Sequence, residues 1–265
     1  MPKNLFYTLL FLMLAMQLSA QVSAKKDSTG SKPDSLKQLD EVIISSTRTE
    51  TRIENTPTRV EVLGSEEVDE ESGVKPTHVA SLLGDVAGIQ AQQTSAISNN
   101  TEMRIQGLPG GYTQLLRDGL PLFGGYASSF SVLQIPPLDL KQIEIIKGAS
   151  STLYGGGAIA GMINLISKKP SLKGPERYLL INHSTLQESN FNIYLSERDK
   201  KKGYSFFGGG SYQRPKDVNR DGFSDLPQTE TIVMHPVFYA YPNEKNVFSL
   251  GLNSTFEERR GGDMQ

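Results

Sequence analysis

The chain contains no cysteine and no tryptophan among its 265 residues. The lack of cysteine excludes thiolate catalysis, cysteine-ligated metals, disulfide bonds and a lipid anchor on an N-terminal cysteine. Histidine is scarce, because only His78, His183 and His235 are present, and their wide spacing favours structural roles over a shared metal site. The formal net charge of −2 gives no sign of the basic surface that a nucleic-acid partner favours.

Long hydrophobic runs are also missing, since no stretch reaches the roughly 18 apolar residues of a membrane-spanning helix. The N-terminus carries Lys3, then a short apolar run to Met16, then small residues up to Ala20 and Ala24. This order predicts a secretory signal peptide over residues 1–24, cleaved after Ala20 or Ala24, with an N-terminal anchor helix as the alternative. Any membrane crossing by the exported chain would then use β-strands.

Residues 25–54 are mostly polar and without periodicity, which predicts a flexible linker. Within this linker, residues 39–45 form a short β-branched run with polar segments on both sides. An edge strand is one interpretation of this run. Its place on a flexible tether favours the other interpretation, in which it adds as a strand to the sheet of a partner protein.

Residues 55–170 mix helical and strand patterns and predict a compact α+β domain. Helices are expected to start near Ser65 and Pro76, and Asp118-Gly119 indicates a tight turn between strands. Residues 142–169 stand out, because an isoleucine-rich run leads into five glycines within fourteen residues and then into a second apolar run. We expect two strands around a glycine loop here.

Residues 171–265 have a different texture, with 13 of the 21 phenylalanines and tyrosines of the chain. Segments of about ten residues separated by turns are the weak signature of a membrane barrel. The sequence therefore predicts an α+β domain followed by the first strands of an antiparallel transmembrane β-barrel. Five strands are expected, at residues 177–185, 189–198, 203–213, 229–241 and 247–256.

The connections between these strands differ in length and character, and residues 186–188 form a short one. The long segment 214–228 is expected outside the cell and the short turns at 199–202 and 242–246 in the periplasm. Because five strands cannot close a barrel, and an open edge in lipid is not viable, we expect the chain to be part of a longer polypeptide.

Specific sequence blocks carry a resemblance to a known family. The chain resembles the N-terminal part of TonB-dependent outer-membrane receptors in Met103-Arg104-Ile105-Gln106-Gly107-Leu108, in Leu116-Arg117-Asp118-Gly119-Leu120-Pro121-Leu122, and in Ile143-Glu144-Ile145-Ile146-Lys147-Gly148 followed by Ser151-Thr152-Leu153-Tyr154-Gly155. Many members of the family have arginine where this chain has Gln106. On this resemblance, residues 39–45 look like a TonB box, 55–170 like a plug domain and 171–265 like the start of the barrel.

The resemblance implies a receptor and not an enzyme, with no required cofactor. In the family, a 22-stranded barrel in the cell outer membrane holds the plug, and TonB pulls on the TonB box to drive uptake. The expected substrate is a ferric siderophore, with haem or a cobalamin-type chelate as alternatives. The implied TonB-binding residues are Asp40, Glu41, Val42, Ile43 and Ile44, and the implied substrate-binding residues on the outer plug loops are Gln92, Gln93, Ser98, Asn99, Phe123, Tyr126 and Phe130.

The long connection also contains a calcium-loop pattern. Asp217, Asn219 and Asp221 alternate as in an EF-hand, Gly222 follows, and the remaining candidate ligands are Phe223, through its carbonyl, and Asp225. Position twelve is Gln228 instead of the usual glutamate, so only weak calcium binding is expected. A solvated turn is the alternative.

Two other functions compete with the receptor hypothesis. The glycines from Gly155 to Gly161 follow a strand and resemble a dinucleotide-binding loop, but such a loop should open a helix, and Met162 to Ser167 predicts a strand. The second alternative is a soluble exported binding module that is complete at 265 residues.

Overall fold

The structure is a computed structural model. It describes residues 43–44, 51–52, 60–74, 76, 78–95, 100–122, 135–149 and 157–264, all within one compact unit of residues 41–265. Within these residues, no helix is long and apolar enough to cross a membrane.

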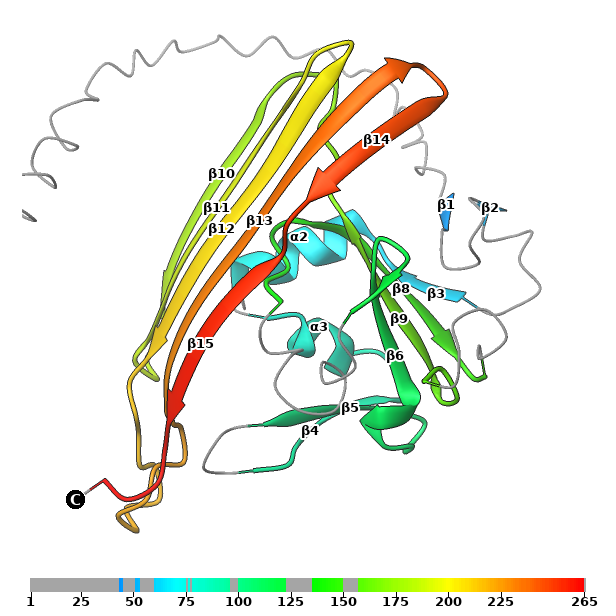
Figure 1. Cartoon of the computed structure of the whole chain (residues 1–265). Coiled ribbons are helices and arrows are strands. Elements are labelled where there is room, and N and C mark those ends of the chain that lie inside the picture. Colours follow the sequence, from blue (N-terminus) through cyan, green and yellow to red (C-terminus); the bar gives the residue numbers. More distant parts are fainter. Residues whose placement is uncertain are drawn as a thin grey trace, which may run out of the picture. The chain divides into compact units, whose positions relative to one another are not determined.

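A five-stranded sheet forms the centre of the α+β part (Figure 1). Its strands, in spatial order, are β3 (Val60–Leu63), β8 (Leu140–Lys147), β9 (Gly161–Ser167), β6 (Thr113–Arg117) and β7 (Leu120–Pro121). Only β6 and β9 pair in parallel. The predicted tight turn at Asp118-Gly119 joins β6 to β7, and both residues have positive φ angles, 50° and 78°.

The glycine at the start of β9 is required by close packing. A Cβ on Gly161 would lie 2.2 Å from the carbonyl oxygen of Ile146 on β8. In addition, residues with a side chain rarely adopt the backbone φ angle of 149° that Gly161 has. The segment after the glycine loop is therefore a strand against β8, as predicted. A dinucleotide-binding loop would have a helix at this place, so the structure does not support that alternative.

Two short helices cover the sheet, α2 (Ser65–Val74) and α3 (Ala80–Gly84). Together with the hairpin of β4 (Ile89–Gln93) and β5 (Thr101–Ile105), they enclose a core that includes Val68, Leu83, Met103, Ile105, Ile143 and Ile163. A 3-10 turn, η2 (Gly110–Tyr112), leads into β6. Helix α3 starts later than the predicted Pro76, because the N–H of Val79 donates to Ile135 O at 2.9 Å, outside the helix.

The second part is an antiparallel sheet, here called the wall sheet. Figure 1 shows β10 (Glu176–His183), β11 (Glu188–Arg198), β12 (Lys202–Gln213) and β13 (Gln228–Asn243) side by side. These four strands confirm the prediction to within two residues at each end. Along β13, Thr231, Val233 and Val237 are buried while Ile232 and Met234 between them are exposed. The sheet therefore has one inner face and one exposed apolar face.

The prediction of a single last strand over residues 247–256 is wrong. The structure has two strands, β14 (Asn246–Gly251) and β15 (Ser254–Arg260), and both pair with β13. The break lies opposite Pro236, which has no N–H to donate to the ladder, although its carbonyl still accepts from Leu252 N at 3.0 Å.

The inner face of the wall sheet packs against the α+β part. Leu138 lies in one buried cluster with Tyr194, Phe207 and Val233 of three adjacent strands. Polar contacts join the same parts, since Asn192 Nδ2 donates to Pro76 O at 3.0 Å. The two halves of the described chain are thus held together by both apolar and polar contacts.

Candidate functional site

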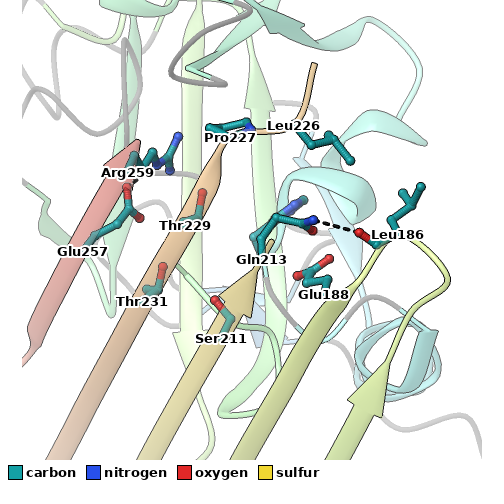
Figure 2. Close-up of a pocket in the computed structure, with 11 residues that line it drawn as sticks. Leu186, Glu188, Ser211, Gln213, Leu226, Pro227, Thr229, Thr231, Glu257 and Arg259 are labelled. Carbon is teal, nitrogen blue, oxygen red and sulfur yellow. Dashed lines mark hydrogen bonds and ion pairs between the residues drawn. The ribbon is translucent and has the colours of Figure 1, made fainter. Parts of the chain in front are cut away.

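A polar cavity of about 130 Å³ lies at one end of the inner face of the wall sheet, beside the long 214–227 connection. Figure 2 shows side chains from β11, β12, β13 and β15 around it. His78 comes from the α+β part, and all the other lining residues come from the wall sheet and its connections: Leu186, Glu188, Ser211, Gln213, Leu226, Pro227, Thr229, Thr231, Glu257 and Arg259.

The strand register explains why these polar residues meet. Residues that are cross-strand partners lie directly opposite each other and share a face of the sheet. One such row crosses β11, β12, β13 and β15 and consists of Glu188, Gln213, Thr229 and Arg259. The next row, two residues along each strand, consists of Asn190, Ser211, Thr231 and Glu257. Two adjacent polar rows therefore line this end of the inner face.

The charged residues of the cavity are two carboxylates and one guanidinium. Glu257 Oε1 accepts from Arg259 Nε, and both side chains are almost fully buried, at 8% and 9% exposed. The other oxygen of Glu257, Oε2, is buried and has no hydrogen-bond partner among the described residues. Glu188 accepts from Asn190 Nδ2 at 3.3 Å. These two carboxylates and the guanidinium sum to a negative charge.

The neutral polar residues are held in place by the adjacent turn. Gln213 Nε2 donates to Leu186 O at 2.8 Å and to Arg214 O at 2.7 Å, and Figure 2 marks the first of these bonds. Among the described residues, no phenylalanine or tyrosine lines the cavity. The described lining therefore offers hydroxyl, amide, carboxylate and guanidinium groups together with the imidazole of His78.

A buried ionic network lies farther along the same inner face. Asp139 Oδ2 accepts from Arg117 on β6 and lies 2.7 Å from Nδ1 of His235 on β13. Burial raises the pKa of Asp139, but the charges and hydrogen bonds of Arg117 and His235 outweigh it and hold the pKa below its ordinary value. Arg117 Nε also donates to Ser167 Oγ at 3.2 Å. This network connects the wall sheet to the centre of the α+β sheet.

Two of the seven predicted substrate-binding residues, Gln92 and Gln93, lie within the described structure. Gln92 and Gln93 lie exposed on β4, where Gln93 Nε2 donates to Ser95 O at 3.2 Å, and neither lines the cavity. The other five lie outside the described residues: Ser98, Asn99, Phe123, Tyr126 and Phe130.

The predicted TonB-binding run is described only at its end. Ile43–Ile44 forms strand β1, which pairs antiparallel with β2 (Thr51–Arg52). Asp40, Glu41 and Val42 lie outside the described residues. The extended backbone expected for this run is present at Ile43 and Ile44, and its partner here is the same chain.

The calcium-loop residues form a compact turn. Asp217 accepts through Oδ2 from Gly222 N at 2.9 Å and through Oδ1 from Arg220 N at 2.5 Å, and Asp225 Oδ2 accepts from Val218 N at 2.7 Å. Asn219 Oδ1 and Asp221 Oδ1 likewise accept from backbone N–H groups two residues on. Among the described residues, no group of three or more acidic or histidine side chains is arranged to hold a metal. Calcium binding by this turn stays a prediction.

Sequence reasoning missed the wall residues of the cavity. The signal was present, because polar residues occur at alternate positions near one end of several predicted strands. Alternation gives the face of each strand but not which residues lie opposite each other. Glu257 was further hidden, because the predicted strand stopped at residue 256.

Comparison with known proteins identifies a matching family model and similar proteins. Residues 52–162 match the family model described as the TonB-dependent Receptor Plug Domain. The chain is 27% identical over 161 residues to the vitamin B12 transporter BtuB of Photobacterium profundum, covering 60% of this chain and 24% of that protein. It is 27% identical over 154 residues to the same transporter of Vibrio vulnificus, covering 58% and 25%. The chain spans about a quarter of the length of these relatives.

Solved structures share the fold. The pyoverdine outer membrane receptor FpvA of Pseudomonas aeruginosa PAO1 matches with a TM-score of 0.67 and 18% identity, over 83% of this chain and 31% of that one. The siderophore receptor PirA of Acinetobacter baumannii matches with a TM-score of 0.62 and 16% identity, over 78% and 32%. The match in each case includes more than the plug segment, so the α+β part and strands of the wall sheet follow the architecture of these receptors.

Proposed function

Because the chain belongs to the TonB-dependent receptors, we propose that it binds a ferric siderophore or a cobalamin-type chelate at the cell outer membrane and takes it up with energy from TonB. The relatives named above are a vitamin B12 transporter and siderophore receptors, and none of them is an enzyme. The observation that carries the proposal is the packing of a plug domain against the inner face of a sheet whose other face is exposed and apolar.

The proposal assigns a role to each part of the chain. Residues 1–24 are the signal peptide, 25–54 the linker with the TonB box at 39–45, 55–170 the plug and 171–265 the first barrel strands. The wall sheet crosses the outer membrane with its apolar face toward lipid. The long 214–227 connection then faces outside, and the polar cavity beside it is where an incoming chelate first meets both plug and wall.

Growth on single nutrient sources tests the substrate part of the proposal. A deletion strain is supplied with one iron chelate, haem or cobalamin at a time, and growth is compared with that of the parent strain. Loss of growth on one iron or cobalamin source, restored by the gene, is the expected result. If the deletion affects none of them, the substrate class is wrong, and a saccharide or peptide becomes the next cargo to test.

The TonB part is tested separately through strand β1. Ile43→Pro removes a backbone N–H and blocks strand addition, so it should abolish uptake while leaving binding of the chelate to cells unchanged. Ser45→Ala in the same segment is the control and should transport normally. Normal uptake by Ile43→Pro would mean that residues 39–45 are not the TonB box.

The soluble binding module remains the alternative function. It requires residues 25–265 to purify without detergent as a single folded species. The receptor proposal expects residues 39–170 to fold alone and residues 171–265 to aggregate, since the exposed face of the wall sheet carries Leu179, Phe191, Ile232 and Phe238. Size-exclusion chromatography of the three fragments separates the two functions.

A further inference from the structure

The charge and hydrogen-bonding groups of the polar cavity point to one class of ligand. We propose that the cavity is a subsite for a cationic, ammonium-bearing arm of the substrate, received by Glu257 and Glu188, and that it selects against polyanionic chelates. This inference rests on the proposed function and specifies the substrate of that same site.

Glu257 lines the cavity and has an almost fully buried side chain. Its side chain is 8% exposed, and only one of its two oxygens is used by Arg259. A buried carboxylate oxygen without a hydrogen bond is costly, so a donor should occupy the space beside it when the site is filled. Because Glu257 lines the cavity, a ligand group that enters there can approach its carboxylate.

The net charge decides which donor fits best. Glu188 and Glu257 place two negative charges in the lining and Arg259 one positive charge, so these three side chains sum to a net charge of −1. Glu188 lies in the same row of the inner face as Arg259, and Glu257 lies in the next row. An ammonium group brings both a compensating charge and up to three N–H donors. A ferric tris-catecholate, which carries several negative charges, would be repelled.

The volume of the cavity and its uncharged polar residues fit a small hydrophilic arm of the substrate. A volume of about 130 Å³ corresponds to roughly four water molecules, so the cavity holds one arm of a chelate and not its metal centre. The hydroxyls of Ser211, Thr229 and Thr231 face the same space and can accept the remaining N–H groups.

The test measures uptake and binding of three iron-loaded probes by cells that make the intact protein. Ferrioxamine B is a ferric trihydroxamate with a free ammonium arm, its N-acetylated form lacks that charge, and ferric enterobactin is a polyanionic tris-catecholate. The expected order of affinity is ferrioxamine B first, the acetylated form weaker by roughly tenfold or more, and ferric enterobactin last.

Variants of the two cavity glutamates test whether the preference for the ammonium-bearing probe arises in the cavity. Glu257→Gln keeps the shape and removes the charge, and it should weaken ferrioxamine B binding by roughly tenfold while changing binding of the acetylated form little. Glu188→Gln, which leaves the Glu257–Arg259 pair intact, should act in the same direction and covers the case in which Glu257→Gln does not fold. Glu258→Gln is the matched control, because Glu258 is the next residue, points to the exposed face and pairs with Arg260.

The possible outcomes distinguish a failure of the inference about the cavity from a failure of the proposed receptor function. Strongest binding of ferric enterobactin, or equal binding of both ferrioxamines in the parent and in both cavity variants, overturns the inference while the receptor function stands. If none of the three iron probes nor cyanocobalamin is bound or taken up, the proposed function fails, and the inference fails with it.

Discussion

Nδ1 of His235 lies 2.7 Å from Oδ2 of Asp139, so a strand of the wall sheet is hydrogen-bonded to the plug across 96 positions of sequence. The same carboxylate oxygen accepts from Arg117 on β6. Any movement of the plug away from the wall must break this bond. The Asp139 network therefore contributes to the packing of the plug against the wall, and two predictions concern it.

Asp139→Asn should destabilise the plug by about 3–5 kcal/mol at neutral pH, because it leaves the buried guanidinium of Arg117 without its counter-charge. The pKa of Asp139 is lowered in the folded protein, so its stabilising contribution is present above its ordinary value of 3.8 and is lost as the pH falls through the lowered value. Thermal unfolding of the purified protein from neutral pH down to about pH 3 should show this acid loss in the parent and a flatter profile in the variant. An equal acid loss in both would contradict the assignment.

His235→Ala removes one partner of Asp139 but keeps the bond to Arg117. We expect a smaller effect, about 1–3 kcal/mol, seen as faster hydrogen exchange of the amides near Leu140 while exchange within the wall sheet changes little. His183→Ala is the control, because His183 is exposed on β10 and bonds only to nearby Ser189 in the described structure. Equal effects of the two histidine variants would show that the plug–wall bond adds nothing.

Gly161→Ala should destabilise the plug by about 1–3 kcal/mol or more, because the new Cβ would meet the carbonyl oxygen of Ile146. Gly174→Ala is the control that separates the effect of the steric clash from the effect of backbone strain. Gly174 has a similar positive φ of 139° but open space around it. The difference between the two melting temperatures measures the packing of β9 against β8, and no difference would mean that strain alone requires glycine at residue 161.

Met234→Arg tests which face of the wall sheet meets lipid. Met234 is exposed near the middle of β13, so an arginine there should cost about 2–4 kcal/mol in the membrane and reduce the amount of folded protein. Glu230→Arg, on the same face but near the strand end, should cost about 1 kcal/mol or less. Similar folded yields for both variants would place the exposed face of β13 in water.

The turn around Asp217 is predicted to bind calcium weakly. Calorimetric titration should give a dissociation constant near the weak end of the EF-hand range, about 10⁻³ M. Gln228→Glu should tighten binding if residue 228 is position twelve of the loop. Asp217→Asn should abolish calcium binding. If the parent and both variants give no heat of binding, the turn is only a solvated turn.

Much of the fold followed from local patterns. The strands from β10 to β13 were predictable because a half-buried strand repeats every two residues, and the tight turn at Asp118 because Asp-Gly tolerates positive φ. The split of the last strand was not predictable. Its cause, Pro236, lies on the neighbouring strand and acts through a missing ladder bond.

The candidate site was harder to predict from the sequence than the fold. The resemblance directed attention to plug loops, and the cavity lies mainly on the wall. Finding it required the register that aligns Glu188 with Gln213, Thr229 and Arg259, and a local pattern carries no information about register.

The order of residues alone thus determined the kind of elements, their sequence along the chain and the family, because propensity, alternation and motif blocks are local properties. The tertiary structure decided which distant side chains meet. The pairing of Asp139 with His235 and the convergence of two polar rows beside Glu257 depend on strand register and on burial. Both arise only when the wall sheet packs against the plug and excludes water from the groups between them.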